Sequence, residues 1–211
     1  LYYVHRRDTR VEIEDVTEVL AGFVKEGKVR AIGYSEIAPS SLKRANAVHP
    51  IAAVQSEYSL STRSPEMGLL QTCKEIGATL VAFSPVGRAL LTDRPHTRKS
   101  AEKLTFLANN PRFMEPHLTE NLKYNAKFRA LASDLNIPAA TLAISWVLRQ
   151  AENIVAIPGT RKIKHLEELA LGGEYELSTE AITMINDILP IGWAHGDRYS
   201  SSQWIGPERY C

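Results

Sequence analysis

Residues 29–55 have the sequence VRAIGYSEIAPSSLKRANAVHPIAAVQ. The stretch begins and ends with short apolar runs, Val29–Tyr34 and Ile51–Gln55, whose length is typical of buried strands. Between these runs, Pro39 and the two serines that follow it predict the first turn of a helix. A strand, a helix and a second strand within so short a distance indicate a βα unit of a parallel sheet.

The same pattern extends along the chain in both directions. Leu1–Val4 and Thr79–Phe83 are further apolar runs, so that the four predicted strands begin 28, 22 and 28 residues apart. Asn153–Ile157 predicts a fifth strand. Helices are expected near residues 13–27, 39–45, 65–76, 120–135, 138–150, 163–171 and 178–189, where apolar residues recur at helical spacing or capping residues mark an end. Strands that alternate with helices in this way predict an α/β fold.

Two segments interrupt this alternation. Residues 87–120 lack clear periodicity and predict a long functional loop that contains short helical pieces. Residues 192–211 place Trp193, Trp204 and Tyr210 among small residues, which predicts an aromatic tail without regular structure. No linker divides the chain, so residues 1–211 are expected to form one domain. Five βα units fall short of a (β/α)8 barrel of ~250 residues, whereas a doubly wound sheet can be complete with five strands; the pattern alone leaves both architectures open.

The composition excludes several classes of protein. Of the 211 residues, 44% are apolar and 23% charged, which is ordinary for a globular protein and excludes general disorder. A net charge of +1 gives no reason to expect a nucleic-acid partner. No apolar run is long enough for a membrane span. Cys73 and Cys211 do not make a disulfide framework, so a cytoplasmic location is expected. Leu1 begins within a strand-like run and without a signal-peptide pattern, which suggests a cut chain.

Polar residues gather at the predicted carboxyl ends of the strands, where both α/β architectures bind their ligands. Glu36 and Glu57 are candidates for an acid–base pair, although nothing in the sequence fixes their separation. Gly159-Thr160-Arg161-Lys162 precedes a predicted helix. Free backbone N–H groups and two cations there suit a phosphate, but a solvated polar turn fits equally well. No Rossmann or P-loop glycine motif occurs, and the histidines lack metal-ligand spacing, so no metal is expected.

Five segments, taken in order, resemble the aldo-keto reductase family. They are Tyr2-Tyr3-Val4-His5-Arg6-Arg7-Asp8, Val29–Glu36, Val54–Ser59, Ala82–Arg88 and Ile157–Arg161, the last followed by Leu166-Glu167-Glu168. Each segment alone is a weak signal, whereas five in order with fitting spacings are specific. The resemblance covers essentially the whole chain but only the C-terminal two-thirds of the family's pattern. It implies a (β/α)8 TIM barrel to which this chain supplies strands 4–8, their helices and the C-terminal tail.

The resemblance also implies NADPH as the cofactor and a role for individual residues. His5 matches the histidine that orients the substrate carbonyl. Ser35 and Gln55 match residues that bind the nicotinamide carboxamide, and Phe83 matches the aromatic residue that stacks on the nicotinamide. The remaining matches are Ser84, Val86 and Arg88 at the pyrophosphate, Gly159, Thr160 and Arg161 at the 2′-phosphate, and His165 and Glu168 around the adenosine.

Several positions depart from the family pattern. Glu36 stands where many members have Asn, and Ala89, His165 and Leu169 also differ from common residues. The family's general acid, a Tyr supported by Lys and Asp, belongs to strands that the resemblance places before Leu1. Tyr34 and Tyr58 are substitutes by residue type only. A phenol with a pKa of ~10 needs a neighbouring cation to donate a proton readily at neutral pH.

The sequence therefore predicts an NADPH-dependent oxidoreductase that reduces aldehyde or ketone carbonyls to alcohols by hydride transfer. The main alternative is a truncated, non-catalytic fragment that binds a dinucleotide or a partner. A third reading is another phosphate-binding barrel enzyme that uses Arg161 and Glu57. Five strands alone would expose two sheet edges and apolar surface, so we expect either further N-terminal residues or an assembly such as a homo-oligomer.

Overall fold

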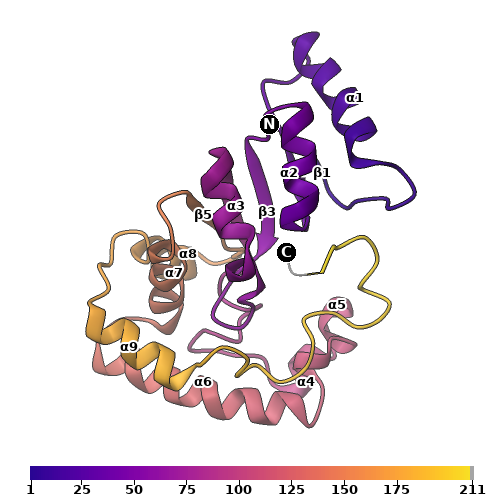
Figure 1. The fold of residues 1–211 in the computed structure, drawn as a ribbon. Coiled ribbons are helices and arrows are strands. Elements are labelled where there is room, and N and C mark those ends of the chain that lie inside the picture. Colours follow the sequence, from indigo (N-terminus) through magenta and orange to yellow (C-terminus); the bar gives the residue numbers. More distant parts are fainter. Residues whose placement is uncertain (210–211) are drawn as a thin grey trace.

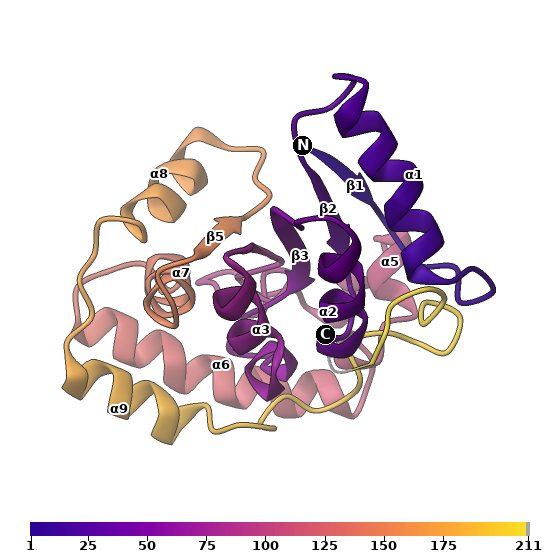
Figure 2. The same cartoon turned by 45° about the horizontal axis from the view of Figure 1, so that its top comes forward.

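The sheet at the centre of the protein is parallel and runs in the order of the sequence. In the computed structural model, which describes residues 1–209, its strands are β1 (Tyr2–Val4), β2 (Ile32–Ser35), β3 (Ala53–Glu57), β4 (Thr79–Phe83) and β5 (Ile154–Ile157). A doubly wound sheet reverses its strand order at a switch point, whereas a barrel adds each strand beside the previous one. The order β1-β2-β3-β4-β5 is therefore that of a (β/α)8 barrel (Figure 2).

Helices connect the strands and line the outside of the sheet. The three helices α1, α2 and α3 follow the first three strands and lie side by side on one face (Figure 1). The helices and 3-10 turns are α1 (Ile13–Lys25), α2 (Pro39–Val48), η1 (Ser64–Met67), α3 (Leu69–Ile76), α4 (Arg98–Ala101), α5 (Thr105–Ala108), η2 (Pro111–Phe113), α6 (His117–Asp134), α7 (Ala139–Arg149), α8 (Ile163–Leu171) and α9 (Thr179–Ile188).

The structure corrects several predicted bounds: β2 begins at Ile32 rather than at Val29, and β3 spans Ala53–Glu57 rather than Ile51–Gln55. The helix predicted over residues 65–76 is broken at Gly68, where φ is +137°, so that η1 ends before α3 begins. Glycine adopts this backbone conformation readily, whereas other residues do not. As predicted, the loop 87–120 contains short helical pieces, which are α4, α5 and η2, whereas α6 begins at His117 rather than at Glu120.

The second half of the chain wraps around the carboxyl ends of the strands. α9 lies along α6, and the tail from Gly192 then passes α4 and α5 before it returns to the side of α2 (Figure 1). The tail has no helix or strand through Arg209, as predicted, while Tyr210 and Cys211 lie outside the described residues. No single helix in residues 1–209 is long and apolar enough to cross a membrane, and only the pair α6 and α7, bent by 91°, passes on length and composition.

The core lies between the sheet and its helices. Trp146 of α7 is buried against Tyr58, with the two ring centroids 5.7 Å apart, and the guanidinium of Arg63 lies 5.0 Å from the indole. At the two ends of the sheet, by contrast, Tyr2 of β1 and Val155 of β5 are about half exposed (48% and 50%). These apolar side chains are not fully covered by any other part of the described chain.

Two glycines offer a matched test of this packing. A Cβ at Gly172, just after α8, would lie 2.6 Å from Ile144 Cβ of α7, whereas a Cβ at Gly22 in α1 would meet nothing within 4 Å. We expect Gly172→Ala to lower the free energy of unfolding by about 1–3 kcal/mol through overpacking. The same change at Gly22 should raise it by about 0.5–1 kcal/mol, because alanine favours a helix. Urea unfolding followed by circular dichroism measures both; equal stability of Gly172→Ala and the wild type would contradict the close contact of α8 with α7.

Candidate functional site

The parallel register brings the predicted site residues of neighbouring strands together. Ser35 pairs with Gln55 across β2 and β3, and Glu57 pairs with Phe83 across β3 and β4. Phe83 in turn pairs with Ile157, directly before the Pro158-Gly159 segment that follows β5. Because all five strands point the same way, these residues share one edge of the sheet, the edge at which barrel enzymes bind their ligands.

A cleft of about 1340 Å³ opens beside β4 and β5 at this edge. It extends from Phe83 to the start of α8. From the end of α6 to the start of α7, it is also lined by Ser133, Asn136, Ile137, Pro138 and Ala140. Nine of the eleven residues predicted to bind the cofactor line this cleft. They are Phe83, Ser84, Val86, Arg88, Gly159, Thr160, Arg161, His165 and Glu168. Ser35 and Gln55 lie outside its lining, on the adjacent strand ends.

The loop after β4 has a fixed and strained shape. Ser84, Arg88 and Ala89 have φ values of +50°, +54° and +69°, in the left-handed region that costs about 1–2 kcal/mol for a residue with a side chain. Leu90 and Leu91 are fully buried behind them, and Asn125 donates a hydrogen bond from Nδ2 to the Leu90 carbonyl at 2.7 Å. The loop is therefore held by the core, and this position directs Arg88 toward the sheet edge.

At the opposite end of the cleft, α8 begins without an acidic residue in its first turn. Its N-cap is Lys162, which makes no side-chain capping hydrogen bond, and Thr160 Oγ1 accepts from the Lys162 N–H at 3.3 Å. Arg161 is exposed. The backbone N–H groups of the first helical turn, the positive end of the helix dipole and the cations thus act together at one place, which favours a phosphate.

A buried group of charges that the sequence did not predict lies at the ends of β2 and β3. It consists of two carboxylates and three guanidiniums, and we call it the charge cluster. Its members are Glu36, Glu57, Arg88, Arg112 and Arg198. Both carboxylates are fully buried. Arg198 Nη1 lies 2.6 Å from Glu36 Oε2, and Arg88 Nη2 donates to Glu57 Oε2. The two glutamates are therefore engaged in ion pairs and do not stand as a free acid–base pair.

Burial changes the titration of the groups around the charge cluster. Burial lowers the pKa of Arg112 to about 10, although the Glu57 carboxylate acts in the opposite direction. The pKa of Tyr199 rises to about 12, first because of burial and then because of the charges of Glu36 and Glu57. Both shifts leave these side chains in their usual protonation states at neutral pH.

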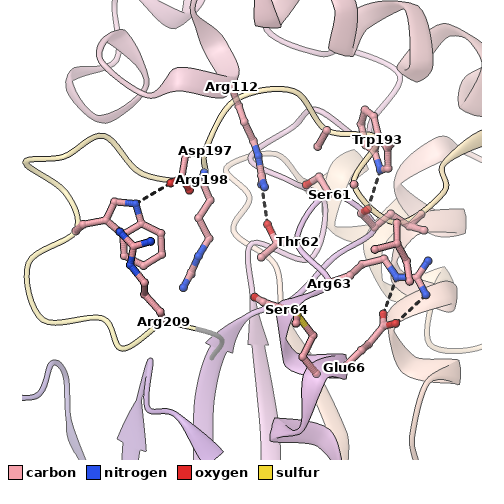
Figure 3. Close-up of a pocket in the computed structure, with 16 residues that line it drawn as sticks. Ser61, Thr62, Arg63, Ser64, Glu66, Arg112, Trp193, Asp197, Arg198 and Arg209 are labelled. Atoms are coloured by element: carbon pink, nitrogen blue, oxygen red, sulfur yellow. Dashed lines mark hydrogen bonds and ion pairs between the residues drawn. The ribbon is translucent and has the colours of Figure 1, made fainter.

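A second, smaller cavity of about 490 Å³ separates the loop after β3 from the tail (Figure 3). Trp193 is buried and donates from Nε1 to the Leu60 carbonyl at 2.7 Å, so it fixes the tail to this loop. Arg112 Nη1 donates to Thr62 Oγ1 at 2.6 Å, and Trp204 Nε1 donates to Asp197 at 3.0 Å (Figure 3). Trp193 therefore both holds the tail in place and lines this cavity.

His5 follows β1 and is exposed at the same edge of the sheet. Its neighbour Arg6 donates from Nη1 to Ser35 Oγ at 3.0 Å, which links the ends of β1 and β2. Tyr34 and Tyr58 are buried in other hydrogen bonds, to Thr17 Oγ1 and to Glu66 Oε1 respectively. Burial raises the pKa of both phenols, which makes them poor substitutes for a general acid.

Within residues 1–209, no three His, Cys, Asp or Glu side chains form a group that could hold a metal ion. Cys73 is buried, and burial raises the pKa of its thiol to about 12, so it is unreactive at neutral pH.

Comparisons with known proteins agree with this architecture. A family model described as the aldo/keto reductase family matches residues 1–190. A probable aldo-keto reductase 1 of Glycine max is 39% identical over 94% of this chain and 57% of its own length. The aldo-keto reductase yakc [NADP(+)] of Schizosaccharomyces pombe is 34% identical over 94% and 59%. The solved glycerol dehydrogenase of Gluconobacter oxydans superposes with a TM-score of 0.77 at 25% identity over 89% and 57%.

The chain thus spans somewhat more than half the length of the relatives it matches. The match to the family model nevertheless covers all five strands and every helix through α9. Identity above 30% over nearly the whole chain agrees with that match. The chain belongs to the aldo/keto reductase family.

Proposed function

We propose that this protein is an NADPH-dependent oxidoreductase that reduces aldehyde or ketone carbonyls to alcohols. The observation that carries the proposal is the single cleft that joins Phe83 at the end of β4 to the basic start of α8. The cleft is large enough for a dinucleotide, since ordinary ligand pockets measure about 300–1,000 Å³. An aromatic ring at one end and a phosphate-binding helix start at the other fit the two ends of such a molecule.

Each part of the cleft has a role in this proposal. Arg161 and Thr160 hold the 2′-phosphate, while His165 and Glu168 flank the adenosine. The strained loop from Ser84 to Arg88 contacts the pyrophosphate. Phe83 stacks on the nicotinamide, with the amide of Gln55 and the hydroxyl of Ser35 beside its carboxamide. When bound, the reduced nicotinamide supplies a hydride to the carbonyl carbon.

The remaining steps concern the carbonyl oxygen. His5, exposed at the end of β1, orients this oxygen so that its carbon faces the nicotinamide. The oxygen takes up a proton to complete the alcohol; by resemblance to the family, that proton would come from a Tyr supported by Lys and Asp. The substrate is a small molecule, and we place the protein in the cytoplasm, with assembly or additional strands covering the edges at β1 and β5.

A second candidate is a fragment that binds a dinucleotide or a partner without turnover. It is favoured by the burial of Tyr34 and Tyr58 in other hydrogen bonds. Both candidates require the cleft to bind the dinucleotide, and they differ only in catalysis.

The first prediction concerns the 2′-phosphate. Arg161→Ala should weaken binding of NADP+ about 10- to 100-fold, because charged hydrogen bonds are worth about 1.5–3 kcal/mol. Binding of NAD+, which lacks that phosphate, should change less than about twofold. Titration calorimetry measures both affinities. Lys74→Ala, which removes one exposed cation from α3, is the control for net charge. Equal losses for NADP+ and NAD+ would argue against a 2′-phosphate site at Arg161.

The second prediction concerns turnover. NADPH absorbance should fall in the presence of a panel of aldehydes and ketones, with one alcohol formed for each NADPH consumed. His5→Ala should lower kcat at least about tenfold, because it removes a group that orients the substrate, and should leave the Kd for NADPH within about twofold. Dinucleotide binding without consumption of NADPH would favour the non-catalytic candidate. The absence of both binding and turnover would reject both candidates.

A further inference from the structure

Arg88 stands between the cleft and the C-terminal tail. Arg88 lines the cleft, and its guanidinium also reaches the charge cluster. There Nη2 donates to Glu57 Oε2, and Nη1 donates to the Arg198 carbonyl at 3.3 Å. The same guanidinium lies over two rings, 4.9 Å from the centre of Phe106 and 5.4 Å from that of Tyr199. One side chain therefore touches the wall of the cleft and the tail together.

Glu57 fixes the position of this guanidinium. Its carboxylate is fully buried at the end of β3, and Oε1 accepts a hydrogen bond from Thr62 Oγ1 at 3.0 Å. Arg112 and Arg198 approach the same carboxylate at 3.7 Å and 3.6 Å. A carboxylate held on several sides in a buried place is a rigid anchor, because each of its partners loses solvation if it moves.

Contacts with the charge cluster and with the neighbouring residues Phe106 and Asn110 hold the tail segment 196–204. Arg198 pairs with Glu36 at 2.6 Å, and its carbonyl accepts from Asn110 Nδ2 at 2.7 Å. Gly196 contributes its carbonyl to Arg112 Nε at 3.3 Å, and the side-chain amide of Gln203 donates to the Phe106 carbonyl at 3.0 Å. The segment has no helix or strand. Its order therefore depends on these side-chain contacts rather than on a backbone ladder.

We propose that Arg88 links occupation of the cleft to the order of tail segment 196–204, and that Glu57 is the positioning residue for Arg88. The inference rests on the proposed function, since it takes the occupant to be a dinucleotide. A guanidinium carries five donors in a rigid fork, so it can meet an anion in the cleft while it keeps Glu57 and the Arg198 carbonyl.

The sign of the coupling follows from the contacts. A pyrophosphate in the cleft restricts Arg88 to the position in which it holds the Arg198 carbonyl, so cofactor binding orders the tail. Coupling between two sites is reciprocal in free energy. An ordered tail therefore favours the dinucleotide, and loss of the Glu57 anchor weakens dinucleotide binding, because Arg88 must then be ordered by the ligand alone.

Hydrogen exchange on the wild-type chain tests the coupling without a substitution. Two ligands at matched saturation are compared, NADP+ and adenosine 2′-monophosphate, which carries the 2′-phosphate but no pyrophosphate. Amides of residues 196–204 should exchange at least about fivefold more slowly with NADP+, the lower end of typical couplings. Adenosine 2′-monophosphate should change the exchange rates of these amides less than about twofold. Unchanged or faster exchange with NADP+, or equal slowing by both ligands, would overturn the inference.

Variants test the two residues that hold Arg88. Glu57→Gln should weaken NADP+ binding about tenfold or more and leave adenosine 2′-monophosphate binding within about twofold. Because this change unbalances a buried cluster, Phe106→Leu provides a second test. Phe106 is 42% exposed, and Phe106→Leu removes the ring over Arg88 together with its edge contact to Tyr199, 6.1 Å between ring centroids. The slowing of exchange by NADP+ should fall by at least about half. Met114→Leu, at a comparably exposed apolar residue, should leave it unchanged.

The outcomes separate this inference from the proposed function. If the wild-type chain binds neither NADP+ nor adenosine 2′-monophosphate, the proposed function fails and the inference with it. If both ligands bind and the tail exchanges equally with each, the proposed function stands and the coupling alone is wrong. If Phe106→Leu retains the full slowing by NADP+, Arg88 is not the link.

Discussion

Every candidate site residue in this protein depends on the in-register hydrogen bonding of five parallel strands. The register determines which residues of neighbouring strands lie side by side. Ser35 therefore lies beside Gln55, and Glu57 lies beside Phe83. A shift of one residue in β3 would turn Glu57 to the other face of the sheet and remove the anchor of three guanidiniums. The cleft, the charge cluster and the tail all use side chains that this register places at one edge.

The charge cluster buries several charged side chains at the carboxyl ends of β2 and β3. A buried ion pair gains little over apolar packing, because both partners lose their hydration, whereas the loss of one partner leaves a buried charge uncompensated. In the cluster this cost is reduced because each carboxylate has several partners. Glu57 accepts a hydrogen bond from Arg88 and lies near Arg112 and Arg198. Glu36 also accepts a hydrogen bond from the Glu57 N–H at 2.9 Å. Three loops and the tail are joined as a result. The polar network is a means of fixing loop positions rather than a source of large net stability.

Local patterns predicted much of the fold, whereas distant pairings did not emerge from them. The strand Thr79–Phe83 and the helix Ile163–Leu171 were predicted to the residue, because their apolar spacing and flanking residues act over short distances. The break at Gly68 was missed, since a single glycine does not reveal the sign of its φ. The charge cluster joins residues separated by up to 162 positions, from Glu36 to Arg198, and no local signal records such pairs. Nine of the eleven predicted cofactor residues line one cleft, while their individual roles remain predictions.

The left-handed residues of the loop after β4 have a consequence for how this sequence can change. Ser84, Arg88 and Ala89 occupy a backbone region that glycine enters without penalty. Selection for thermal stability alone would thus admit glycine at any of the three. At Arg88 that gain would remove the side chain that joins the cleft to the tail. Laboratory evolution of this protein should therefore relieve strain at position 89 without loss of function, whereas glycine at position 84 or 88 would remove a side chain that the proposed function uses. Three residues with similar backbone geometry would then diverge at different rates.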